Sequence, residues 1–164
     1  MKPHTRKLYD HFPGKTTHNR LIGVKPRLVE VVVLGMRYST LDFGVSEGKR
    51  TLERQKQLYR QGKSRTMKSR HLDGEAVDIY VSRGKDNGYN FEQLCECMKG
   101  IWYAAEYFDV LGKMRWGGVW DRRLDKLNPE KLLDEHKAYV KRFRSAKGRS
   151  PLVDLPHIEF ASNT

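Results

Sequence analysis

Cysteine is scarce in this sequence, which has two cysteines among 164 residues. Cys95 and Cys97 lie two positions apart in an expected helix, so their side chains point to different faces and a disulfide between them is not expected. No further cysteine is present to complete a zinc knuckle. This usage is typical of a protein made in a reducing compartment.

Long apolar runs are also missing. The first twenty residues, MKPHTRKLYDHFPGKTTHNR, lack the apolar stretch of a signal peptide, and no later segment approaches the length of a membrane span. We see no internal repeat and no low-complexity tract. These absences predict one globular domain without a signal peptide, which would need another route of release to work outside the cytoplasm.

Acidic residues are too few to balance the basic ones, and the formal net charge is +12. Residues 2–30 carry seven basic and two acidic side chains, residues 49–70 carry nine basic ones against Glu53 alone, and residues 113–150 carry twelve against five. Such an excess indicates a polyanionic partner or surface. Nucleic acid and the bacterial envelope both qualify, and charge alone does not separate them.

Helical periodicity is clearest in residues 91–108, where apolar side chains recur at three- and four-residue spacing. The run that follows Pro26 fits a strand or a helix, and its length and apolar spacing favour a mostly buried helix. Other expected elements are a short helix at 4–11, a strand ending at Gly48, a helix at 51–61, a strand at 75–81, a strand within KMRWGGVW, a helix opening at Pro129 and a final strand in LVDLPHIEF. Helices and short strands without regular alternation predict an α+β fold.

Three side chains near strand ends are candidate metal ligands. His71 precedes the strand at 75–81, Asp78 lies within it, and His157 opens the last strand. Two imidazoles and one carboxylate form a common catalytic zinc set that leaves a fourth position for water. Taken separately, each has a structural alternative: a loop cap, a buried salt bridge and a strand-edge histidine.

Several motifs together resemble a known family. SRHLDGEAVD matches the SxHxxGxAxD signature of zinc peptidases related to D-Ala-D-Ala carboxypeptidases and dipeptidases, and DLPH followed by IEF matches their second signature. GVSEGKRTLERQKQLYRQGKS and RWGGVW resemble the segments before and between the two signatures. The combination, over about residues 25–160, is most similar to the bacteriophage L-alanyl-D-glutamate endopeptidases, which are endolysins.

The resemblance implies a small antiparallel sheet flanked by helices, of the hedgehog and DD-peptidase type, in a single catalytic domain at 25–164. Residues 1–24 are a basic N-terminal segment, of which the first twenty have no clear family counterpart, and 121–150 resemble an enlarged basic helical insertion. The alternation of the strand at 75–81 places Ala76, Asp78 and Tyr80 on the face that lines the cleft.

The resemblance also assigns the chemistry. It implies one zinc ion held by His71, Asp78 and His157, and it makes Asp154 the general base that takes a proton from water and passes it to the leaving amine. A turn residue before Pro156 is the structural alternative for Asp154.

Further side chains are expected at the substrate. Arg50 would bind a substrate carboxylate or stabilise the oxyanion, with a solvated surface charge as its alternative. Ser69 and Trp116 are expected to contact substrate, although a turn serine and a core tryptophan are the structural alternatives. Glu159 is either a partner for a metal-binding imidazole or a rim salt bridge.

The function implied is a zinc-dependent peptidoglycan hydrolase that cleaves the L-alanyl-D-glutamate amide and lyses the bacterial cell. It would accumulate in the host cytoplasm as a monomer and act on the wall after release, with its basic charge holding it at the anionic envelope. A D-alanyl-D-alanine carboxypeptidase or dipeptidase with the same zinc site is one alternative. A basic nucleic-acid-binding protein is another, but no helix-turn-helix, zinc-finger or RNP signature supports a specific nucleic-acid partner.

Overall fold

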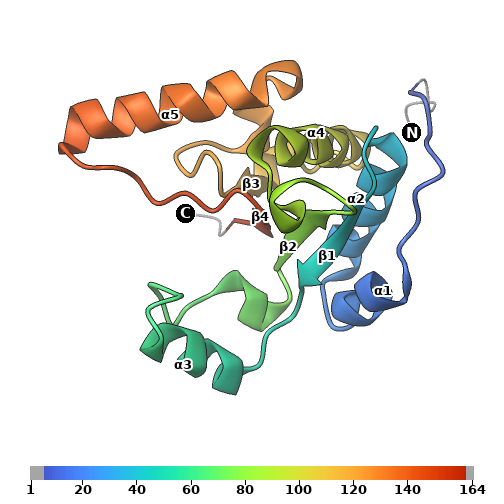
Figure 1. The fold of residues 1–164 in the computed structure, drawn as a ribbon, viewed down its shortest axis with the longest axis horizontal. Coiled ribbons are helices and arrows are strands. Elements are labelled where there is room, and N and C mark those ends of the chain that lie inside the picture. The colour runs from blue at the N-terminus through green and yellow to red at the C-terminus, as the bar shows by residue number, and fades with distance from the viewer. Residues whose placement is uncertain (1–5, 162–164) are drawn as a thin grey trace.

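The strands of the sheet are ordered differently in space and along the chain. In the computed structural model, which describes residues 6–161, four strands form one antiparallel sheet in the order β1-β2-β4-β3 (Figure 1). The strands are β1 (Phe43–Glu47), β2 (Ala76–Val81), β3 (Met114–Trp116) and β4 (His157–Phe160). The expected α+β fold with a small antiparallel sheet is confirmed, and the last strand of the chain lies inside the sheet, beside β2.

Within residues 6–161, five α-helices accompany this sheet. They are α1 (Lys15–Leu21), α2 (Pro26–Tyr38), α3 (Leu52–Arg60), α4 (Phe91–Tyr107) and α5 (Leu132–Lys147). Two begin at the caps that the sequence indicates, because Thr51 accepts a hydrogen bond from the Arg54 amide and Asn90 accepts one from the Gln93 amide. Pro26 occupies the first turn of α2, where its missing N–H costs nothing.

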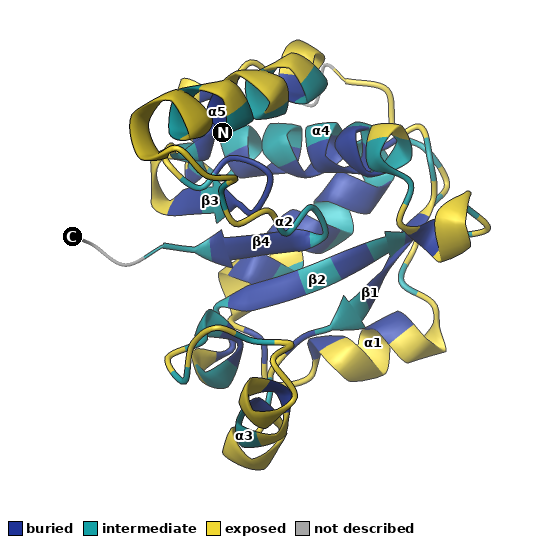
Figure 2. Ribbon diagram, turned by 60° about the vertical axis from the view of Figure 1, so that its left-hand side comes forward, coloured by how far each residue is buried: buried dark blue, intermediate teal, exposed yellow. Residues whose placement is uncertain are grey.

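The apolar core lies between one face of the sheet and the pair α2 and α4, whose facing surfaces are buried (Figure 2). Alternation along β2 sends Val77, Ile79 and Val81 into this core, each at most 3% exposed. The opposite face of β2 carries Asp78, which is only partly buried. One face of the sheet is therefore packed into the core, and the opposite face is available for the polar side chains of a site.

The expected helix at 4–11 is wrong. Residues 6–11 are irregular, residues 4 and 5 lie outside the described part, and the first helix is instead α1. α1 has seven residues, no side-chain cap and no acidic residue in its first turn, so local signals do not predict it. It is held by tertiary contacts, because Thr17 accepts from the Val45 amide and Leu21 is buried in the core.

Residues 121–150 contain two short 3-10 turns followed by α5. α5 is fixed to the domain by Leu132 and Tyr139, which are both buried. Within the described residues, no helix is both long and apolar enough to cross a lipid bilayer.

Candidate metal centre and substrate cleft

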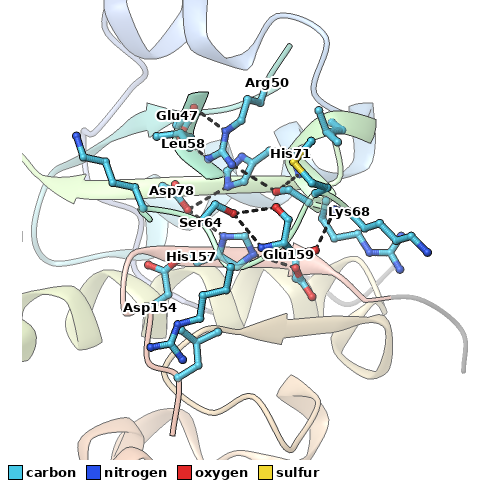
Figure 3. Close-up of a pocket in the computed structure, with 18 of the residues that line it drawn as sticks. Glu47, Arg50, Leu58, Ser64, Lys68, His71, Asp78, Asp154, His157 and Glu159 are labelled. Carbon is cyan, nitrogen blue, oxygen red and sulfur yellow. Dashed lines mark hydrogen bonds and ion pairs between the residues drawn. The ribbon is translucent and has the colours of Figure 1, made fainter. Parts of the chain in front are cut away.

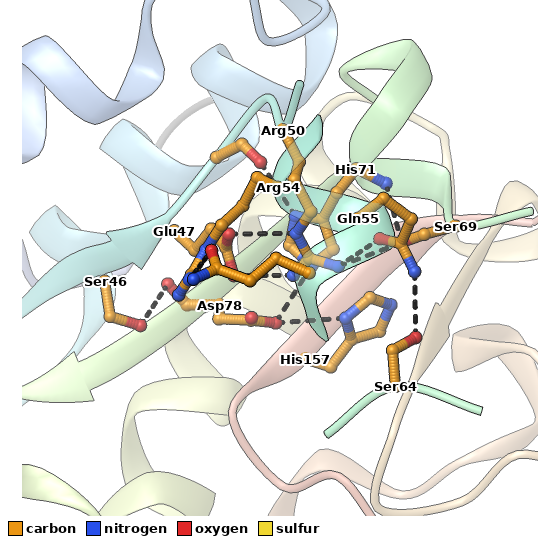
Figure 4. A network of polar contacts seen from close by, with 12 residues as sticks. Ser46, Glu47, Arg50, Arg54, Gln55, Ser64, Ser69, His71, Asp78 and His157 are labelled. Carbon is orange, nitrogen blue, oxygen red and sulfur yellow. Dashed lines mark hydrogen bonds and ion pairs between the residues drawn. The ribbon is translucent and has the colours of Figure 1, made fainter. Parts of the chain in front are cut away.

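Strand register brings the central side chains of the site into one row. Glu47 pairs with Asp78 between β1 and β2, and Asp78 pairs with His157 between β2 and β4. Directly opposed residues in antiparallel strands project to the same face of the sheet. Asp78 and His157, which are 79 positions apart in the chain, therefore lie side by side (Figure 4).

A short 3-10 turn, Arg70–Asp73, adds the third member of this group. Ser69 caps the turn by accepting a hydrogen bond from the His71 amide, and Gly74 ends it with a φ of 68°. The His71 ring is 2% exposed, and its Nδ1 lies 2.8 Å from the Gly48 carbonyl oxygen. A carbonyl can only accept, so Nδ1 carries the proton and a neutral His71 offers the lone pair of Nε2 to the centre.

The three ligand atoms face one another across a small space. His71 Nε2 lies 3.3 Å from Asp78 Oδ1, and His157 Nδ1 lies 3.0 Å from the same oxygen. One potential ligand atom from each residue falls within 4.8 Å of the others. On the far side of its ring, His157 Nε2 lies 2.9 Å from Glu159 Oε2.

This arrangement fits a metal ion. Each imidazole has one nitrogen turned to the centre and the other held by an oxygen acceptor, as is usual for metal-bound histidine. Two imidazoles with one carboxylate match the donor set of catalytic zinc sites. The expected grouping of His71, Asp78 and His157 is thus present in the fold, with Asp78 pointing toward His157.

The protonation of the group reflects its close packing. Burial pushes the pKa of Asp78 upward, but hydrogen bonds with His157 and His71 outweigh burial and hold that pKa well below its usual range. Burial lowers the pKa of His157, but the Asp78 and Glu159 carboxylates outweigh it and raise that pKa to about 9. Contacts between the imidazoles and the carboxylates therefore outweigh burial in setting both pKa values.

Asp154 lies beside His157 at the edge of the same cleft (Figure 3). Its backbone is fixed at both ends, because its amide donates to the Gly117 carbonyl and its carbonyl accepts from the His157 amide. A Cβ on Gly117 would stand 2.1 Å from the Asp154 carbonyl oxygen, so this approach requires glycine. Burial, and then the negative charge of Asp78, raises the pKa of the Asp154 carboxyl above its usual range.

Arg50 is held in a dense polar network above the centre (Figure 4). Its side chain is 8% exposed. Nε and Nη2 donate to the two carboxylate oxygens of Glu47 at 2.9 and 2.5 Å, and Nη1 donates to Gln55 at 2.7 Å. Ser69 Oγ lies 3.5 Å from Nη1. The structure places Arg50 and Ser69 together at the cleft, with the arginine already paired.

Gln55 connects this network to the outer wall of the cleft. It is fully buried, and its Nε2 donates to Ser64 Oγ and to the Thr66 carbonyl. The sequence reasoning did not single out Gln55 or Glu47. Gln55 shares a helix face with Leu58, and a polar residue on the apolar face of a helix is a sequence signal that could have pointed to it. The pairing of Glu47 depends on strand register, which gives no such signal.

The strand Met114–Trp116 requires one correction. Trp116 is fully buried, pairs with Ile158 on the core face of the sheet and donates its indole N–H to the Leu155 carbonyl. Its position contradicts the expected contact with substrate and agrees with the core alternative. Period-two alternation sends the neighbouring Arg115 to the cleft face instead.

Arg115 and Trp120 form the wall of the cleft beyond His157. Arg115 Nη2 lies 2.6 Å from Glu159 Oε1, and its guanidinium lies 5.0 Å from the Trp120 ring centroid. The Trp120 and His157 ring centroids are 5.3 Å apart. Glu159 is thus both a partner of His157 and a salt-bridge residue, which combines the two expected alternatives.

These groups line a cleft of about 990 Å³ (Figure 3). Its inner end holds the three-residue centre with Asp154, and its outer wall is formed by the basic segment 62–73. A cleft of this size, with polar groups converging at one end, is large enough for several residues of a peptide.

Comparisons with known proteins agree with this architecture. The profile of a family described as phage L-alanyl-D-glutamate peptidase matches residues 11–137. A crystal structure of the Serratia marcescens L-Ala D-Glu endopeptidase ChiX is similar at 27% sequence identity and a TM-score of 0.67, over 93% of this chain and 92% of that one. A search of curated protein sequences gave no match.

Proposed function

The chain belongs to the phage L-alanyl-D-glutamate peptidase family, and we propose that it hydrolyses the amide between L-alanine and D-glutamate in the stem peptide of peptidoglycan, as a zinc-dependent endolysin. The observation that carries this proposal is the convergence of His71, Asp78 and His157 at the inner end of a cleft large enough for a peptide. The choice of this amide bond rests on the family and on the similar Serratia enzyme.

In this proposal His71 Nε2, His157 Nδ1 and one oxygen of Asp78 hold the zinc ion. When bound, zinc supplies a Lewis acid that polarises a carbonyl and makes water nucleophilic near neutral pH. The Gly48 carbonyl and the Glu159 carboxylate fix the two rings from behind, at 2.8 and 2.9 Å. These contacts set which ring nitrogen is available to the metal.

Asp154 is proposed as the general base. Its carboxylate takes a proton from the attacking water and later delivers that proton to the amine of D-glutamate as the C–N bond breaks. A pKa raised by burial and by the charge of Asp78 suits the first of these steps, because a carboxylate of higher pKa accepts a proton more readily than an ordinary aspartate.

Arg50 is proposed to stabilise negative charge on the substrate, with Ser69 beside it. Its Nε and Nη2 are engaged by Glu47, and its Nη1 by Gln55 and, at 3.5 Å, by Ser69. A substrate carboxylate or oxyanion would therefore use the second N–H of Nη2 or displace one of these partners. The proposal also includes release from the host cytoplasm to the wall, which the membership in a phage family supports, and action as a monomer.

Lysis of purified peptidoglycan tests the proposal. We expect activity to be lost after chelation, to return when zinc is added, and to fall at least about a thousandfold in His157→Ala, as for removal of an essential catalytic group. His18→Ala removes an exposed histidine of α1 and is the matched control, expected to retain full activity. A fully active His157→Ala protein would refute the metal assignment.

A further inference from the structure

A second concave surface lies away from the cleft, where α5 crosses the start of α4. It has a volume of about 420 Å³ and shares no lining residue with the cleft. Phe91 and Val140 form its apolar floor, and Lys137, Lys141 and Arg144 stand around it. We call this surface the α5 groove.

The charge around the α5 groove has one sign. Residues 136–149 contain six basic side chains and no acidic one. Lys137, Lys141 and Arg144 are exposed and repeat at intervals of four and three residues, which aligns them along one side of the helix. Among the described residues no ion pair involves any of the three, and Arg144 has only a hydrogen bond to Ser150.

The groove is built on a fixed scaffold. On the inner side of α5, Tyr139 is buried and donates to the Leu152 carbonyl. His136 Nδ1 lies 2.7 Å from the Gly118 carbonyl oxygen, and the His136 and Phe91 rings make a T-shaped contact with centroids 4.8 Å apart. Outward, the helix is exposed along its length (Figure 2). The cations are therefore presented by a helix that is already anchored.

An apolar floor between cations matches an anionic amphiphile. A nucleic acid would use the cations, but stacking of successive bases needs several aromatic faces along the basic track. The floor offers one phenyl ring, Phe91, which is already in contact with the His136 ring. A phospholipid satisfies both parts, with phosphate at the amino and guanidinium groups and glycerol or acyl carbon against Phe91 and Val140.

We propose that the α5 groove docks this protein on membranes that contain anionic phospholipid. The groove shares no lining residue with the cleft, so the residues proposed for docking are separate from those at the metal centre. Basic side chains at an anionic membrane each contribute about a fivefold increase in partitioning. Three of them, aligned on one rigid helix, give about a hundredfold.

Cosedimentation of the full chain with vesicles tests the proposal. We expect binding at an ionic strength of about 0.15 M to vesicles of equal parts phosphatidylcholine and phosphatidylglycerol, and none to phosphatidylcholine alone. The variant K137E/K141E/R144E should partition at least about a hundredfold less. The variant K15E/K25E/K113E carries the same charge change at exposed positions elsewhere and should stay within about twofold of wild type.

Val140→Ser tests the floor without changing charge, and we expect it to lower partitioning several-fold while the thermal unfolding curve shows a folded protein. Equal losses in the two charge-reversal variants would overturn the proposal, because binding would then follow net charge alone. Unchanged binding by Val140→Ser would overturn the role of the floor. A dimer that Val140→Ser dissociates would assign the groove to a second copy of the chain instead.

Discussion

Glu159→Gln should weaken metal binding although Glu159 lies outside the three-residue centre. The carboxylate is 4% exposed and accepts from His157 Nε2 at 2.9 Å and from Arg115 Nη2 at 2.6 Å. The amide of glutamine still accepts a hydrogen bond but has no charge, so the imidazole becomes a poorer donor to the metal. Loss of such a partner typically lowers metal affinity 10- to 100-fold, or about 1.4–2.8 kcal/mol.

Competition with a chromophoric zinc chelator measures this change. Glu130→Gln is the matched control, because Glu130 is also an ion-paired carboxylate, 2.7 Å from Lys99 Nζ, but lies outside the cleft. We expect the zinc dissociation constant of the control to stay at the wild-type value. If Glu159→Gln bound zinc as tightly as wild type while remaining folded, the inferred hydrogen bond to the metal-binding His157 would be wrong.

Two further predictions concern the backbone beside the site and the thiols. Gly117→Ala should lower peptidase activity about a hundredfold, because the new Cβ would stand 2.1 Å from the Asp154 carbonyl oxygen. Gly112→Ala is the control, since the atom nearest to its Cβ is 3.8 Å away and wild-type activity is expected. Equal activities of the two variants on peptidoglycan would contradict this prediction. Burial, and then nearby acidic groups, raises the pKa of Cys95 to about 12, and burial raises the pKa of Cys97 to about 12 despite a hydrogen bond. At pH 8 the reactive thiolate fraction is then about a thousandfold below that of an ordinary thiol. A thiol reagent should therefore label the folded protein slowly and the urea-unfolded protein fast. Rapid labelling without urea would show that the two thiols are not buried.

Elements with strong local signals were predictable from the sequence. α4 has a cap at Asn90 and apolar side chains at helical spacing, and it begins and ends within one residue of the expected range. α1 was not predictable, because its seven residues are stabilised by a hydrogen bond from the Val45 amide to Thr17 and by burial of Leu21. Such contacts join segments far apart in the chain, and no local pattern encodes them.

The site residues were likewise predictable only where a local motif marks them. The resemblance of two motifs to the signatures of a zinc-peptidase family identified His71, Asp78 and His157, which the fold brings together. Alternation alone does not say which face of β3 meets the core, so the sequence did not separate the buried Trp116 from the cleft residue Arg115. That choice is made by pairing with β4, which only the three-dimensional register specifies.

Mass spectrometry of the fragments released from purified peptidoglycan tests the central claim most directly. Cleavage of the L-alanyl-D-glutamate amide predicts stem peptides with a new amino terminus on D-glutamate, together with glycan that retains L-alanine. Release of free D-alanine without those fragments would contradict the account and would indicate a D-alanyl-D-alanine carboxypeptidase built on the same centre.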